Sequence, residues 1–315
     1  MKIIELFAGI GAPHMALKKC GINCEVVGIS EIDKFADKAY HYIHGEATNF
    51  GDITKIQELP PCDFLHASSP CQSFSNAGKR NGVQGESGLI YEFYRLMDNY
   101  KNRDELPKFI SFENVPELKT NFKEVYDELI KNLNDWGYNT YDGILSAHHY
   151  GNPTIRTRLF VIGIRKDIDN GGFKMPNSTV ATSKCINDFV DEEDNNTKYK
   201  NVPYHDLKKG GGVWKGWLEI GVKRPTQSNR VADQNGYCPT ITRSYAGVYI
   251  KAKKDLGYRL LSPHELWKIS GYSEEDWAKI KNNFSSSRID KLIGNSIALG
   301  PLEAIYTNLK PLIDN

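Results

Sequence analysis

One cysteine stands in a setting that suits a nucleophile. Cys71 lies in Ser69-Pro70-Cys71-Gln72-Ser73-Phe74-Ser75, shortly after an apolar stretch that ends at Ala67. A cysteine within an apolar strand is usually a core residue, but Cys71 comes past a predicted strand end, behind a proline and among polar residues. In an open α/β sheet, this edge holds the ligand. A thiolate there can act as a nucleophile if its pKa is lowered.

Two further motifs place charged side chains at predicted strand ends. Glu113 leaves an apolar strand in Phe112-Glu113-Asn114-Val115-Pro116, and Arg156 and Arg158 stand just before the strand 159–164. A partly buried carboxyl can hold or share a proton. Arginines on one strand face suit the recognition of phosphate or carboxylate groups. A surface-loop acid and a solvated strand edge are the ordinary alternatives, and the presence of Cys71 favours a chemical role for Glu113.

A glycine-rich turn, Phe7-Ala8-Gly9-Ile10-Gly11, follows the first predicted strand. Glycines there let a ligand approach the backbone, and the start of the next helix favours negative charge. The second strand ends at Glu31, where a nucleotide-binding sheet places an acid against ribose hydroxyls. Asp52, followed by Ile53, suits an adenine amine. Each residue alone is best explained by a turn or a helix cap, but together and in this order they favour a cofactor that contains adenosine.

Alternating strands and helices must position these motifs. Helical periodicity is present at 13–19, 88–100 and 122–133, and Gly137 suits a helix stop. Apolar segments predict strands at 2–7, 25–30, 63–67, 109–112, 140–145 and 159–164. This alternation predicts an α/β fold with a mostly parallel sheet that helices cover on both faces.

The pattern changes after about Lys166, where glycine pairs and short strand-like periodicity appear and a polar, acidic stretch runs from 191 to 200. We expect a catalytic, cofactor-binding domain at 1–166 and a smaller irregular domain at 167–257. C-terminal helices at 258–315 would return to the first domain. Two of these helices are predicted at 262–269, with Pro263 as the first helical residue, and after Gly294.

The composition is that of an ordinary globular protein, with 315 residues, 40% hydrophobic and 25% charged. A net charge of +1 neither requires nor excludes nucleic acid. No apolar run approaches the ~20 residues that span a bilayer, and the N-terminus does not resemble a signal peptide, so we expect a cytoplasmic protein without a membrane partner. The six cysteines are scattered and form no Cys-x-x-Cys pair. We therefore expect no disulfide framework and no metal site, and interpret His41 and His44 as residues of a helix surface.

The order of these motifs resembles that of the cytosine-5 DNA methyltransferases of the bacterial and phage type. Phe-Ala-Gly-Ile-Gly at 7–11, Pro-Cys-Gln-Ser-Phe-Ser at 70–75, Glu-Asn-Val at 113–115 and Gly-Asn-Ser at 294–296 form a specific set, and the resemblance covers nearly the whole chain. It implies a Rossmann-like S-adenosylmethionine-dependent methyltransferase sheet, with a smaller irregular target-recognition domain at 167–257. It also implies transfer of methyl to carbon 5 of a cytosine flipped out of duplex DNA, through a covalent cysteine adduct. A restriction-modification context makes a cognate restriction endonuclease a candidate genetic partner, and we expect a monomer.

The resemblance further implies roles for individual residues. Cys71 would be the nucleophile, Glu113 would hydrogen-bond the ring nitrogen and amine of cytosine, and Arg158 would contact the base carbonyl. The cofactor would be bound by Phe7, Ala8, Gly9, Ile10, Gly11, Glu31, Ile32, Asp52, Ile53, Pro70, Leu89, Asn295 and Ser296. DNA contacts are expected from Gln72, Ser73, Ser75, Lys79, Arg80, Arg156, Arg230, Thr240, Thr242 and Arg243.

Three other functions compete with this interpretation. An RNA cytosine methyltransferase on the same scaffold is the nearest, but the cysteine-phenylalanine-threonine segment typical of its eukaryotic members is absent from the sequence. A DNA-binding protein that has lost catalysis is disfavoured by the presence of Cys71, Glu113 and Arg158. A dinucleotide oxidoreductase would need a third glycine where Met15 and Ala16 stand.

Overall fold

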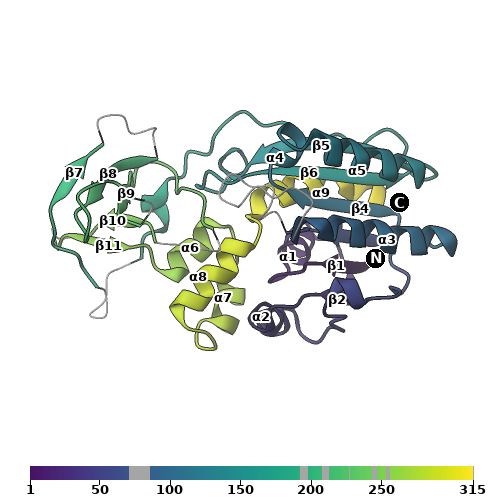
Figure 1. Cartoon of the computed structure of the whole chain (residues 1–315), viewed down its shortest axis with the longest axis horizontal. Coiled ribbons are helices and arrows are strands. Elements are labelled where there is room, and N and C mark those ends of the chain that lie inside the picture. The colour runs from purple at the N-terminus through teal and green to yellow at the C-terminus, as the bar shows by residue number, and fades with distance from the viewer. Residues whose placement is uncertain are drawn as a thin grey trace. The chain divides into compact units, whose positions relative to one another are not determined.

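The computed structural model describes residues 1–70, 86–191, 198–207, 213–226, 228–242, 247–252 and 256–314. The chain forms two compact units (Figure 1). The first consists of residues 1–145, 157–177 and 301–315, and the second of residues 146–156 and 178–300. These bounds reflect packing alone, so the predicted division into catalytic and target-recognition domains stays a prediction.

A six-stranded sheet forms the centre of the first unit, in the order β2-β1-β3-β4-β6-β5. Its strands are β1 (Lys2–Leu6), β2 (Glu25–Ser30), β3 (Phe64–Ala67), β4 (Phe109–Asn114), β5 (Tyr138–Ser146) and β6 (Thr157–Arg165). β1 is parallel to β2 and β3, and β3 is parallel to β4, whereas β6 runs antiparallel to β4. The predicted mostly parallel α/β sheet is confirmed, as are its six strands.

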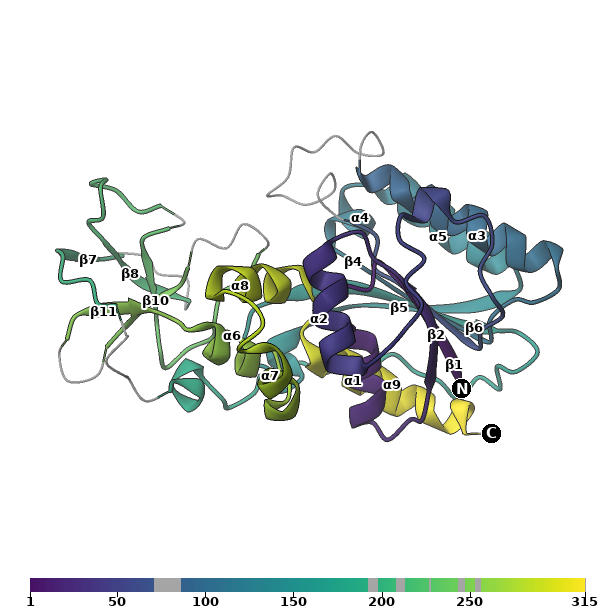
Figure 2. The same cartoon turned by 90° about the horizontal axis from the view of Figure 1, so that it is seen from below.

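Helices cover both faces of this sheet. α3 (Ile90–Asn102) and α5 (Lys123–Asp135) lie on one face, and α1 (Ala12–Lys19) and α9 (Leu299–Ile313) lie on the other (Figure 2). Phe93 of α3 and Leu129 of α5 belong to one core cluster with Leu65 and Ile110 of the sheet. The apolar stripes predicted at 88–100 and 122–133 are thus core faces. The unit also contains α2 (Lys34–His44), α4 (Glu117–Thr120) and the short 3-10 helices η1 (Ile53–Lys55) and η2 (Glu86–Leu89).

The other face of the sheet carries a buried row of polar side chains. Glu5, His66 and Ser111 are register partners on β1, β3 and β4, and each is at most 1% exposed. Tyr40 of α2 donates a 2.5 Å hydrogen bond to Glu5 Oε2, and the hydroxyl of Tyr306 in α9 lies 3.3 Å from Ser111 Oγ. His66 Nδ1 is 3.1 Å from Ser111 Oγ. Because buried polar groups are costly without partners, these bonds stabilise the row.

The second unit is built on a smaller sheet with the order β11-β10-β9-β8-β7. Its strands are β7 (Tyr204–Asp206), β8 (Trp214–Leu218), β9 (Arg230–Ala232), β10 (Tyr249–Lys251) and β11 (Tyr258–Leu260). The strands are short, as the periodicity after Lys166 predicts. The 3-10 helices η3 (Ala147–His149) and η4 (Ile186–Phe189) belong to this unit.

Three helices follow this sheet along the chain: α6 (Pro263–Ile269), α7 (Glu274–Ile280) and α8 (Ser286–Asn295). α6 begins where predicted, because Ser262 and Glu265 form a capping box and Pro263 stands in the first turn. Glu265 also pairs with Arg259 at 2.7 Å, with both side chains at most 5% exposed. α9 confirms the helix expected after Gly294. Among the described residues, no helix has the length and apolar character needed to cross a membrane.

The buried imidazole of His66 predicts a pH dependence of stability. Burial lowers its pKa to about 3, whereas an exposed histidine in the unfolded chain titrates near 6.5. The folded state therefore binds fewer protons than the unfolded chain between these two pH values. The contribution of the neutral His66 side chain to stability is fully present above about pH 6.5 and is lost as the pH falls toward 3. We expect the free energy of unfolding of His66→Gln to fall less steeply between pH 7 and 4.5, by up to about 1.4 kcal/mol per pH unit. Urea unfolding at several pH values measures this difference, and equal slopes for both proteins would contradict it.

Candidate active site and cofactor site

The turn after β1 has an unusual backbone that glycine makes possible. Phe7, Gly9 and Gly11 all have positive φ angles, of 57°, 57° and 77°. Such angles cost little for glycine but strain other residues, so the strain is confined to Phe7. A Cβ placed on Gly9 would meet no atom within 4 Å. The predicted turn therefore leaves open space beside its backbone, into which a ligand can fit.

The carboxylate of Glu31 fixes this turn to the end of β2. Glu31 Oε2 accepts a 2.8 Å hydrogen bond from Gly9 N, and Oε1 accepts one of 2.7 Å from Asp33 N. Burial raises the pKa of Glu31, while these backbone bonds act in the opposite direction. A carboxylate oxygen accepts more than one hydrogen bond, so Glu31 retains capacity for hydroxyl donors. Asn49 holds the backbone of Glu31 on both sides, accepting from its N–H at 3.1 Å and donating to its carbonyl at 2.9 Å.

Four further residues that are predicted to bind the cofactor differ in exposure. Ile32 is 72% exposed, which is unusual for a large apolar side chain beside a polar turn. Asp52 is the N-cap of η1, and its pKa is lowered because its carboxylate accepts hydrogen bonds from the Thr54 side chain and backbone. Ile53 is buried, and Leu89 is partly buried against the core. Ile32 and Asp52 are thus available at the surface, whereas Ile53 belongs to the core and Leu89 packs against it.

The end of β3 leads into the segment that carries the predicted nucleophile. Ser68 Oγ lies 2.7 Å from His66 Nε2, and the amide of Asn114 donates to the carbonyl and hydroxyl oxygens of Ser69 at 3.2 and 3.1 Å. The chain that approaches Pro70 is therefore held from two neighbouring strands. The predicted site residues Cys71, Gln72, Ser73, Ser75, Lys79 and Arg80 lie outside the described residues.

Glu113 and Arg158 form an ion pair at the same edge of the sheet. Arg158 Nε lies 3.0 Å from Glu113 Oε1, and the two side chains are only 16% and 10% exposed. The pair forms because β6 is antiparallel to β4, so that the beginning of β6 lies beside the end of β4. A second bond, 2.7 Å from Arg158 Nη1 to the carbonyl of Thr157, fixes the guanidinium. The structure thus brings together two of the three predicted catalytic residues.

Four of the five thiols among the described residues are poor nucleophiles. Burial raises the pKa of Cys24 to about 11 and those of Cys62 and Cys238 to about 12, and burial also raises that of Cys20. At neutral pH these four groups are therefore protonated and unreactive. Among the described residues, no group of three or more His, Cys, Asp or Glu side chains could hold a metal ion.

The second unit contains the remaining predicted residues. Arg156 is buried, and its guanidinium donates to the carbonyls of Ile241, Gly294 and Ser296, of which the bond to Ile241 measures 2.6 Å. Arg156 therefore ties distant segments of this unit together. Three residues expected to contact DNA or the cofactor lie at its surface: Thr240, Asn295 and the partly exposed Thr242. Ser296 is buried, and Arg243 lies outside the described residues.

Arg230 of β9 lies over the Trp214 ring, with its guanidinium carbon 5.7 Å from the ring centroid. A cation held on an aromatic face is a suitable contact for phosphate or a base edge. Arg230 is also only partly exposed. Its side chain packs on the Trp214 ring, and this contact holds the guanidinium in one direction.

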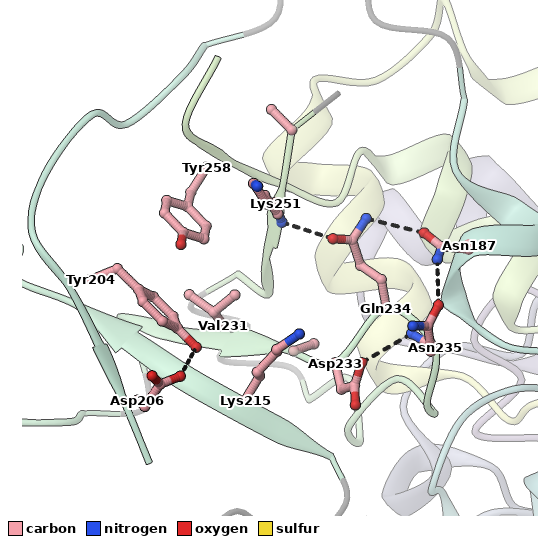
Figure 3. Close-up of a pocket in the computed structure, with 12 residues that line it drawn as sticks. Asn187, Tyr204, Asp206, Lys215, Val231, Asp233, Gln234, Asn235, Lys251 and Tyr258 are labelled. Carbon is pink, nitrogen blue, oxygen red and sulfur yellow. Dashed lines mark hydrogen bonds between the residues drawn. The ribbon is translucent and has the colours of Figure 1, made fainter. Parts of the chain in front are cut away.

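The second unit also contains a pocket of about 400 Å³ (Figure 3). The rings of Tyr204 and Tyr258 stack at one side with a 5.3 Å separation, and Gln234 accepts a 3.0 Å hydrogen bond from the backbone of Lys251 at the other. Gln234 also donates to Asn187 at 3.1 Å. The pocket is lined by residues other than the predicted catalytic and cofactor-binding ones, so the candidate site is defined by the strand ends of the first unit.

Several residues at the site escape prediction from sequence. Asn49, His66 and Asn114 each bond to a site segment, but the partners of His66 and Asn114 are fixed by the register of the strands, and those of Asn49 by the packing of α2. Asn114 was visible as part of the Glu-Asn-Val motif, and His66 as a polar residue inside an apolar strand. His44 corrects an expectation: it is partly buried, and its Nε2 lies 3.0 Å from the carbonyl oxygen of Ile10 instead of facing solvent on a helix surface.

Solved structures with the same arrangement define the class of fold. The crystal structure of Schizosaccharomyces pombe Dnmt2 methyltransferase matches with a TM-score of 0.75 over 99% of each chain, at 22% identity. The Entamoeba histolytica methyltransferase EhMeth matches with a TM-score of 0.73 over 99% of this chain and 98% of that one, at 19% identity. At these identities the likeness concerns the fold, which is that of a methyltransferase with a Rossmann-like sheet and a smaller second unit.

Sequence comparisons then define the family. The model for "C-5 cytosine-specific DNA methylase" matches residues 1–311, and the chain belongs to this family. It is 29% identical to the type II methyltransferase M.HhaI of Haemophilus parahaemolyticus, over 98% of this chain and 94% of that protein. It is 39% identical to the orphan methyltransferase M.SPRI of Bacillus phage SPR over 53% of this chain, and spans only 38% of that relative. The resemblance seen in the motifs is confirmed.

The buried ion pair predicts a coupled effect on stability. Arg158→Met should lower the free energy of unfolding by about 3 kcal/mol, because it leaves the Glu113 carboxylate buried without its cation. The double variant Arg158→Met/Glu113→Gln removes both charges and should recover part of this loss. Chemical denaturation of the four proteins of this cycle measures the coupling. Additive effects of the two substitutions would show that the pair contributes nothing to stability.

Proposed function

We propose that this protein is a DNA (cytosine-5-)-methyltransferase that uses S-adenosylmethionine to methylate cytosine within a specific sequence of duplex DNA. The observation that carries the proposal is the Glu113–Arg158 pair at the strand edge, adjacent to Asn114, which holds Ser69 beside the predicted nucleophile segment. Glu113 precedes, in the sequence, the residue that bonds Ser69, and this neighbourhood supports a joint role for the acid, the cation and Cys71. Membership of the C-5 cytosine-specific DNA methylase family supports this chemistry.

Cys71 begins the proposed reaction because carbon 5 of cytosine is a poor nucleophile. Its thiolate forms a bond to carbon 6, and the electron pair of the 5,6 double bond becomes available at carbon 5. Glu113 stabilises protonation at the ring nitrogen, which prevents negative charge from accumulating on the ring. After methylation, a base removes the proton from carbon 5, and the sulfur–carbon 6 bond breaks to release the thiolate. Arg158 contacts the base carbonyl while keeping the carboxylate of Glu113 oriented.

The glycine turn and its neighbours fit an adenosine-containing methyl donor. Open space lies beside Gly9, Glu31 retains acceptor capacity, and the exposed Ile32 offers an apolar surface to a base. When bound, S-adenosylmethionine supplies an electrophilic methyl group. Glu31 would accept hydrogen bonds from the ribose, Ile32 would pack on the adenine, and Asp52 would accept from its amine. The contacts expected of Pro70, Leu89, Asn295 and Ser296 are part of the same proposal.

Duplex DNA is the proposed partner, and the reacting cytosine must leave the base stack to reach the site. We infer that the second unit selects the sequence, since its exposed Thr240 and its Arg230 on Trp214 suit contacts with a nucleic acid. A cytoplasmic location follows from this substrate in a bacterial or phage setting. We also propose that the protein acts as a monomer and that a cognate restriction endonuclease is its genetic partner.

The first test concerns the nucleophile. Cys71→Ala should lose methyl transfer by at least a factor of 10³, because no thiolate remains to activate the ring, while its affinity for the cofactor stays unchanged. Transfer of tritiated methyl to DNA and calorimetric titration with S-adenosylhomocysteine measure the two quantities. Wild-type protein, but not the variant, should also form a covalent complex with a duplex that contains 5-fluorocytosine. A fully active Cys71→Ala would exclude the covalent mechanism.

Substrate choice separates DNA from RNA. Methyl transfer to duplex DNA and to transfer RNA is measured side by side, and activity on RNA alone would overturn the proposal. Bisulfite sequencing of DNA from cells that express the protein then identifies the methylated sequence. The same cells with Cys71→Ala provide the control.

A further test concerns the second unit. Arg230→Gln should weaken DNA binding about tenfold at low salt, because it removes one cation near the nucleic acid. If Arg230 binds a phosphate, the slope of log affinity against log salt should fall by about 0.9. Lys223→Gln is the matched control, because it also removes one cation from the second unit. Lys223 is highly exposed and lies 3.9 Å from Glu219, and we expect its loss to leave the affinity for DNA unchanged. Equal affinity of wild type and Arg230→Gln at all salt concentrations would remove Arg230 from the DNA contacts.

A further inference from the structure

A cluster of titratable side chains packs beneath the glycine turn, and the proposed chemistry does not use it. We call Glu5, His14, Tyr40 and His44 the histidine cluster. They come from β1, α1 and α2, and Glu5 and Tyr40 are completely buried. The His14 and His44 rings stack at 4.6 Å, and the Tyr40 and His44 rings lie 4.4 Å apart. These contacts fix the position of the His44 ring.

The imidazole of His44 bonds directly to the turn. Its Nε2 lies 3.0 Å from the carbonyl oxygen of Ile10, the residue before Gly11. Because a carbonyl oxygen only accepts hydrogen bonds, Nε2 must carry the proton and act as the donor. This bond satisfies a carbonyl of a residue that is only 1% exposed. His44 therefore defines the orientation of the Ile10–Gly11 peptide.

Gly11 leaves the space that His44 fills. A Cβ at position 11 would lie 2.3 Å from His44 Nε2 and 2.7 Å from Tyr40 Cε2, which is closer than real atoms approach. Its φ of 77° also favours glycine. The turn and the cluster consequently fit each other at this point.

Glu5 anchors the cluster from the sheet. Oε2 accepts the 2.5 Å bond from the Tyr40 hydroxyl, and Oε1 accepts a 3.1 Å bond from the backbone N–H of His14 in the first turn of α1. One buried carboxyl thus holds the helix that follows the turn and the ring that supports His44. The turn is held on both sides of Gly11, at the Ile10 carbonyl and at the His14 amide.

We propose that His44 is a positioning residue for the cofactor, which fixes the Ile10–Gly11 backbone in the conformation that receives S-adenosylmethionine. The inference rests on the cofactor site of the proposed function. His44 acts through the Ile10 carbonyl and takes no part in methyl transfer. A turn that is already ordered loses less conformational entropy on binding, so the bond increases cofactor affinity.

Two substitutions separate the hydrogen bond from the packing of the ring. His44→Phe keeps an aromatic ring between His14 and Tyr40 but has no donor, whereas His44→Gln keeps an N–H donor but has no ring. Titration calorimetry with S-adenosylhomocysteine, which cannot react, reports cofactor affinity. We expect His44→Phe to raise the Kd about tenfold, in line with the loss of one hydrogen bond, and His44→Gln to remain within about threefold of wild type. At saturating cofactor, kcat and the KM for DNA should stay within about twofold.

A second histidine of the same helix provides a matched control for the His44 variants. His41→Phe makes the same change three residues earlier, where the imidazole lies 3.7 Å from Asp37, and should bind the cofactor as wild type does. If His44→Phe binds S-adenosylhomocysteine as wild type does and His44→Gln binds it weakly, cofactor affinity depends on the ring and not on the hydrogen bond. The proposal is then overturned. Loss of kcat at saturating cofactor would overturn it too. Melting temperatures identify any variant that fails to fold, and the other of the two His44 variants still decides the case. Wild-type protein that binds no S-adenosylhomocysteine would instead contradict the proposed function.

Discussion

The alignment of strand ends in the first sheet is the constraint on which the candidate site depends. Leu6 pairs with Ser30 on one side and with Ala67 on the other, and Ala67 pairs with Phe112. The residues that follow β1, β2 and β3 therefore leave the sheet at one level, and β4 continues for two residues beyond it, to Asn114. β6 runs in the opposite direction, so its first residues reach the same edge. This reversal places Arg158 beside Glu113, an arrangement that a wholly parallel sheet would not allow.

The buried polar row of Glu5, His66 and Ser111 lies beneath two segments of this edge, the glycine turn after β1 and the residues after β3. Glu5 lies under the glycine turn and His66 under Ser68, and the two are register partners on adjacent strands. Burial shifts their pKa values in opposite directions, to about 7 for Glu5 and about 3 for His66. In both cases the low-polarity interior favours the neutral form. Hydrogen bonds, more than ionic interactions, thus organise the support of the site.

Much of the first unit could be predicted from sequence, because most of its strands are apolar segments and its helices α3 and α5 show clear periodicity. The motifs at the strand ends also identified Glu113, Arg158 and Glu31. The partners of these residues could not be predicted, since the Arg158–Glu113 distance depends on strand direction and the contacts of Asn49 and His44 depend on how α2 packs. In the second unit, three-residue strands such as β7 and β9 are too short to show alternation. α7 and α8 were missed because polar and charged residues dominate both segments.

The missing side chain of Gly11 constrains how this sequence can diverge. The space it leaves is filled from another segment by His44 and Tyr40, so a change at one position alters what the others can accommodate. Position 11 cannot acquire even a methyl group until the ring at position 44 becomes smaller or moves. We therefore expect the effect of a substitution at position 11 to depend on which side chains stand at positions 40 and 44. A short glycine-rich motif and a histidine distant in the sequence thus share one packing constraint.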